Sequence, residues 1–114
     1  MDLTELLVLV ETEVTAMLRG TLPKSANRHW IILVDDVGVE AADVREDSPP
    51  PHELLASLVD AGAHGAAYVT HLREHPERIV AQLLTANPRN SDVRMASVRR
   101  TSASVRLGKW EYTV

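Results

Sequence analysis

Two histidines and a glutamate form the segment of this chain most suggestive of catalysis. Residues 71–75 read His-Leu-Arg-Glu-His, a spacing found in zinc-dependent hydrolysis, where both imidazoles bind Zn²⁺ and the glutamate is the general base. That chemistry requires a helix, which brings positions i and i+4 to one side, and a third, distant ligand. Pro76 follows at once, and Tyr68, Val69 and Thr70 before the segment favour a strand. We therefore expect His71 and His75 to be partly exposed at a turn, with no metal bound.

Two adjacent carboxylates, Asp35 and Asp36, end the apolar run Trp30 to Val34. Carboxylates at strand ends serve many α/β enzymes, but neighbouring strand residues point to opposite faces and cannot converge on one substrate without a turn. A solvated turn is the simpler expectation. The chain has no cysteine, which excludes disulfides and thiolate chemistry. It also lacks a G-x-S-x-G elbow, a P-loop and a Rossmann glycine pattern, so no catalytic residue and no cofactor is predicted.

Positive charge gathers near the C-terminal end and predicts a possible anion-binding face. Its members are Arg94, Arg99, Arg100, Arg106 and Lys109. If 76–86 were helical, this segment and the basic hairpin would resemble the recognition helix and wing of a DNA-binding winged helix. Against a nucleic-acid partner stand the pI near 5.7 and the presence of only four aromatic residues.

The net charge of −4 conceals a division of the chain. Up to Ala63 there are twelve acidic and four basic residues, and after it four acidic and eight basic ones. Such a division allows head-to-tail self-association or an anionic partner at the basic end, although strand-borne arginines that simply face solvent give the same count.

The clearest helix runs from Asp2 to Gly20. Asp2 and Glu5 form a capping-box pattern, and Gly20 suits the position after the end. Its first two turns are apolar around most of the circumference, which indicates burial on more than one side. We therefore predict a contact with a second copy through this helix, unless loops of the same chain cover it. The residues of this predicted interface are Leu3, Leu6, Val8, Leu9 and Val10.

The middle of the chain predicts one strand and one helix. Trp30 to Val34 is continuously apolar, as expected of a strand covered on both faces. It continues either as one bent strand to about Val39 or as a tight hairpin. After the proline-rich loop 45–51, Ser48 is a plausible cap for a helix that runs to Ala61.

Four further runs predict an antiparallel meander: 66–72 (within the ambiguous segment 64–73), 78–86, 92–100 and 104–114. The first two also fit helices, and we favour strands because their lengths match the later runs. In the last run, Val105 and Leu107 share one parity, while Trp110, Tyr112 and Val114 have the other. A bulge at Gly108 would place all five on one side.

The sequence thus predicts a single α+β domain over residues 1–114: an N-terminal helix, a buried strand, a second helix, then a C-terminal antiparallel meander packed against the helices. We expect a non-enzymatic, cytoplasmic interaction or accessory module that acts as a homodimer or with a protein partner, and that has no membrane segment. The rich Ala, Val, Leu and Arg content suggests a GC-rich bacterial genome.

One alternative is a small-ligand-binding or enzymatic pocket. The order of elements is similar to that of hot-dog and cystatin-like domains, where a sheet wraps a helix and can hold a ligand, although no site residue carries over. This alternative predicts an enclosed cavity between the helix at 54–59 and the facing strands. An enzyme would need a cleft in which two of His64, His71, Asp35 and Asp36 converge.

Overall fold

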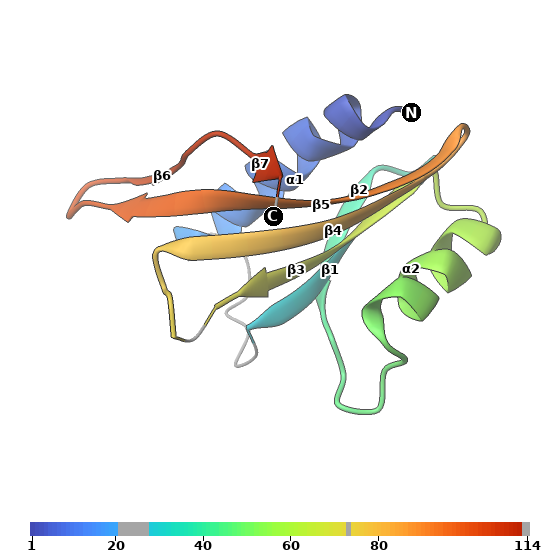
Figure 1. Ribbon diagram of the computed structural model, residues 1–114, viewed down its shortest axis with the longest axis horizontal. Coiled ribbons are helices and arrows are strands. Elements are labelled where there is room, and N and C mark those ends of the chain that lie inside the picture. Colours follow the sequence, from blue (N-terminus) through green and yellow to red (C-terminus); the bar gives the residue numbers. More distant parts are fainter. Residues whose placement is uncertain (21–27, 73, 113–114) are drawn as a thin grey trace.

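The computed structural model describes residues 1–20, 28–72 and 74–112. These residues form two helices and the strands of one antiparallel sheet (Figure 1). The elements are α1 (Leu3–Leu18), β1 (His29–Val34), β2 (Val39–Asp43), α2 (Pro51–Asp60), β3 (Gly65–His71), β4 (Arg78–Ala86), β5 (Arg89–Arg100), β6 (Val105–Leu107) and β7 (Glu111–Tyr112). The strand order is β2-β1-β3-β4-β5-β6, and β7 also pairs with β5. The predicted α+β class is confirmed.

Helix α1 begins and ends where its sequence predicts. The Asp2 carboxylate accepts a hydrogen bond from the Glu5 backbone N–H at 2.8 Å, which satisfies one of the free donors of the first turn. Gly20, just past the end, has φ of +74°, a conformation that costs glycine nothing. Leu6, Val10 and Val14 form its fully buried stripe.

Strands β1 and β2 form a tight hairpin, one of the two predicted possibilities. The turn is closed by the Asp35 N–H, which donates to the Gly38 carbonyl at 3.0 Å. Trp30, Ile32 and Val34 are buried on one face of β1, and Ile31 and Leu33 pack on the other. The prediction of a strand covered on both faces is confirmed.

Helix α2 begins at Pro51, the third of three consecutive prolines, with Pro50 as the N-cap residue and no side-chain cap. The Ser48 hydroxyl instead accepts a hydrogen bond from the Arg45 N–H at 3.1 Å, so the predicted cap at Ser48 is wrong. The physical reason is that the helix starts at Pro51, so Ser48 lies two residues before the N-cap position, which Pro50 occupies without a side-chain acceptor. Gly62, with φ of +115°, follows the end of the helix.

The meander of β3, β4 and β5 has the predicted runs as strands. Segment 78–86 is strand β4, which pairs with β3 on one side and β5 on the other. The helix that a winged-helix arrangement would need at 76–86 is therefore a strand.

The last strand carries the predicted bulge. Val98 pairs with Leu107, and Met95 pairs with Glu111. Between these two pairs β5 has two residues, whereas the facing segment has three, Gly108 to Trp110. The facing segment therefore carries one extra residue, which defines a bulge. Gly108 also lies so close to Ser97 that a Cβ there would collide with the serine hydroxyl. Trp110 packs against the core as predicted, whereas Val114 lies outside the described residues.

The two helices lie on opposite faces of the sheet (Figure 1). One face packs on α1 in the main core, which includes Leu6, Val10, Ile32, Ile79 and Leu83. The other face packs on α2 through a smaller cluster of Leu55, Val59, Ala66 and Leu84. The predicted packing of the meander against the helices is confirmed, and each helix has its own apolar stripe and its own cluster. In hot-dog domains, by contrast, the sheet wraps one helix.

Candidate interaction surface

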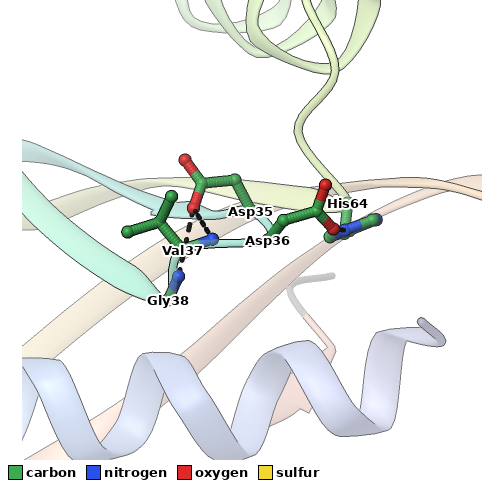
Figure 2. A network of polar contacts seen from close by, with 5 residues as sticks. All are labelled: Asp35, Asp36, Val37, Gly38 and His64. Atoms are coloured by element: carbon green, nitrogen blue, oxygen red, sulfur yellow. Dashed lines mark hydrogen bonds and ion pairs between the residues drawn. The ribbon is translucent and has the colours of Figure 1, made fainter.

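Two groups named for a possible enzyme do meet, at the tip of the β1–β2 hairpin (Figure 2). His64 Nε2 lies 2.5 Å from Asp36 Oδ1, while the Asp35 carboxylate accepts hydrogen bonds from the N–H groups of Val37 and Gly38. The side chains of His64 and Asp36 are 49% and 92% exposed. Solvent screens a charge pair at such exposure. The pair joins the tip of the hairpin to the residue before β3 (Figure 2).

His71 and His75, the two histidines of the H-x-x-E-H segment, contact different partners. His71 Nε2 contacts the Pro76 carbonyl at 2.6 Å, and His75 Nδ1 lies 3.4 Å from Glu77. A hydrogen bond from the Glu77 backbone, with attraction by His75, holds the pKa of the Glu77 carboxyl below its ordinary value despite slight desolvation. Across residues 1–20, 28–72 and 74–112, no three His, Asp or Glu side chains gather closely enough to hold a metal ion.

The five predicted basic residues do not share one face. Arg94 lies on the α1 side, where its Nε is 2.7 Å from Asp92 and its guanidinium lies 3.8 Å above the Tyr112 ring. Both side chains of that ion pair are less than a fifth exposed. Arg99 and Arg106 pair directly across β5 and β6, and strand alternation puts Arg100 on the opposite side. Lys109 lies in the bulge.

The predicted α1 interface is reduced by the chain's own core. Leu6 and Val10 are fully buried under the sheet, so they are not open to a second copy. Val8 is 58% exposed, and Leu3 and Leu9 are partly buried against the core. These three residues are the part of the predicted interface that remains accessible.

A second, partly exposed apolar area lies on the α2 side of the sheet, where the short α2 packs on only part of strands β3 and β4. Along β4 and β5, Val80 pairs with Met95 and Gln82 with Val93. Val80, Met95 and Val93 belong to neither hydrophobic cluster, and Val93 is 38% exposed. With Tyr68, which pairs with Gln82 on β3, they form what we call the open face: Tyr68, Val80, Gln82, Val93 and Met95.

Two grooves border α2 on this side of the sheet. One, of about 480 Å³, lies between α2 and strands β4 and β5, with Leu55, Gln82 and Val93 in its lining. The other, of about 410 Å³, lies between the proline-rich loop and the pair His29 and Tyr68. The first is where the pocket alternative predicted a cavity, but it is an open groove rather than an enclosed space.

Sequence reasoning missed the open face, although a signal for it exists. In β4, Ile79, Ala81 and Leu83 form the apolar face that packs on the main core. Val80 and Leu84 lie on the opposite face of the strand and are apolar too. A strand that is apolar on both faces needs cover on both faces, and only Leu84 receives it from α2.

No family model, curated protein or solved structure matches this chain. No helix of the described residues is long and apolar enough to cross a membrane.

Proposed function

We propose that this protein is a non-enzymatic interaction module that binds a protein partner on the open face. The observation that carries the proposal is the row Val80, Met95 and Val93, which neither helix covers. The solvated face of an antiparallel sheet usually carries polar side chains, so apolar side chains that no helix covers indicate an interaction site. Burying such side chains stabilises a complex by about 25 cal/mol per Å² of apolar area, before the entropy of association is subtracted.

A photo-crosslinking residue at Val93 tests the proposal in the protein's own host, with Val37 as the matched control. Val37 is 90% exposed at the hairpin tip and lies in neither cluster. We expect a defined protein to crosslink at position 93 and not at position 37. The purified protein should then bind by calorimetry, and Val93→Glu or Met95→Glu should each weaken binding at least about tenfold. Equal crosslinking at both positions, or unchanged binding by both variants, would refute the proposal.

A homodimer through Leu3, Val8 and Leu9 of α1 remains a prediction of the sequence. Sedimentation of wild type and Val8→Glu at micromolar concentration checks it. A monomeric wild type would remove the homodimer and leave the open face untouched, because α1 lies on the opposite side of the sheet.

The 480 Å³ groove supports a second candidate, a small-ligand site, because its volume falls in the range of about 300–1,000 Å³ typical of such sites. Apolar Leu55 and Val93 stand beside polar Gln82 and Ser91 there. Fragment screening by NMR should then shift the Gln82 side-chain amide and the Ser91 backbone amide together. If the fragments shift only signals of residues outside this groove, the groove is not a ligand site.

A further inference from the structure

Arg99 and Arg106 form an unusual pair on the projecting arm of β5 and β6. They lie directly opposite one another across the two strands. Their neighbours Val98 and Val105 are buried toward α1, so both arginines face the side of the open face. Like charges directly opposite in a sheet are destabilising, and none of the ion pairs among the described residues includes either arginine.

A third arginine extends this group. Arg78 pairs with Ser97 of β5, two residues before Arg99 on the same face, and is also exposed. The carboxylate of its sequence neighbour Glu77 accepts a hydrogen bond from its own backbone and is attracted by His75 and, more weakly, by Arg78. We call Arg78, Arg99 and Arg106 the arginine rim. The arginine rim borders the open face at the end away from α2. Arg78 and Ser97 form the next pair on that face after Val80 and Met95.

Two of the chain's carboxylates lie near the rim: Glu77 adjoins Arg78, and Glu111 of β7 pairs with Met95. A larger group of carboxylates lies at the opposite edge of the sheet. Strand β2 and the loop after it carry Glu40, Asp43, Glu46 and Asp47, all exposed, and we call these the acidic edge. Four strands separate β2 from β6 in the sheet order. No carboxylate of the acidic edge therefore reaches the arginine rim within one copy.

A second copy could bring its acidic edge to the rim, but the position of α2 opposes this on the open face. A twofold axis parallel to the strands would match acidic edge to arginine rim, yet α2 packs on the central strands β3 and β4, so it would meet its own copy. A twofold axis perpendicular to the strands would place the acidic edge of one copy against the acidic edge of the other. The uncovered strip fits a slender segment better than a second sheet.

From these placements we propose that the open face binds an acidic, amphipathic segment of a partner protein. Its carboxylates pair with the arginine rim, and its apolar side chains pack on Val80, Val93 and Met95. Arginine's planar donors suit carboxylates, which they can bind two bonds at a time. A nucleic acid is disfavoured because Tyr68 is the only aromatic residue of the open face, so stacking platforms for bases are lacking there. The inference rests on the proposed function and names the chemistry of its partner.

The probe is a fluorescent peptide of about eighteen residues, with leucine and glutamate in helical amphipathic order, and a matched peptide with lysine for every glutamate. We expect the glutamate peptide to bind, weakening steeply between about 50 mM and 0.5 M salt, and the lysine peptide not to bind. Arg99→Gln with Arg106→Gln should weaken binding at least about tenfold. The matched control is Arg100→Gln, which removes a charge from the other side of the arm and should change binding less than about twofold.

Equal effects of the double variant and of Arg100→Gln would overturn the acidic-segment inference. The proposed function would survive that result if Val93→Glu still weakens binding of the crosslinked partner. Tighter binding of an oligothymidylate than of the glutamate peptide, lost in the double variant, would assign the rim to nucleic acid instead. Self-association of wild type that the double variant abolishes would assign it to a second copy. Unchanged circular dichroism confirms that each variant is folded.

Discussion

Arg106→Glu should make this protein more stable while removing part of its recognition surface. Arg106 and Arg99 are cross-strand neighbours with like charge. Two unit charges about 6 Å apart in water repel by roughly 0.7 kcal/mol, and reversing one charge changes the interaction by about twice that. Screening at physiological salt and side-chain mobility reduce the gain to about 0.5–1 kcal/mol.

Thermal unfolding followed by circular dichroism measures this gain. For a domain of this size it corresponds to a rise in Tm of about 2–6 °C. Arg99→Glu should give a similar rise. The double variant, with glutamates opposite one another, should return toward wild type, so the two changes are strongly non-additive. At about 1 M salt all three differences should fade.

Arg100→Glu is the control because it changes the net charge equally and lies opposite Val105 rather than a charge. It should change stability by less than about 0.5 kcal/mol. The reasoning fails if Arg106→Glu is neutral or destabilising, or if the two reversals simply add. Either result would mean that the guanidinium groups do not face one another, and the arginine rim would lose its physical basis.

Three further predictions concern the fold. Leu6→Ala, at a fully buried position, should cost about 2–5 kcal/mol in urea unfolding, whereas Val8→Ala, at an exposed one, should cost under about 1 kcal/mol. Thr85→Val should cost about 1–2 kcal/mol, because the buried hydroxyl donates to the Pro88 carbonyl at 2.7 Å; an unchanged midpoint would mean that this bond is not formed. The lowered pKa of Glu77 means that its carboxylate favours the folded state above the ordinary value of 4.5, and that this contribution is lost as pH falls through the lowered pKa. The Tm difference between wild type and Glu77→Gln should therefore shrink as pH falls below about 4.5, and a constant difference would contradict it.

Strand alternation explains what the sequence could and could not indicate about the arm. The parity change at Gly108 predicts the bulge, because the apolar side chains on both sides of it have to reach one core. The same rule places the adjacent residues Arg99 and Arg100 on opposite faces. The sequence therefore already indicates that the basic residues of this segment do not share one face. The Asp92–Arg94 pair also follows from alternation, since residues two apart share a face. The stacking of Tyr112 on Arg94 does not, because it depends on the register after the bulge.

The placement of the helices lies beyond sequence reasoning of this kind. Periodicity shows that Leu6 and Val10 face a core and that Leu55 and Val59 do so too, but not that these are different cores on opposite faces. The open face exists because α2, at ten residues, is about 15 Å long and covers only part of its side. That shortfall depends on where α2 docks, which long-range packing decides.

The repulsion between Arg99 and Arg106 lowers the stability of the folded state, which supports a role of the arginine rim in binding. Elsewhere the chain sets cations beside carboxylates, as in Arg94 with Asp92 and Arg89 with Asp60. At Arg99 and Arg106 a single glutamate would add stability, yet both positions carry arginine. Residues that reduce stability without a role in packing are expected where binding requires them. A bound partner's carboxylates should relieve this repulsion, so the glutamate peptide should raise the Tm of wild type more than that of Arg106→Glu. An equal rise in both proteins would show that the peptide binds away from the rim.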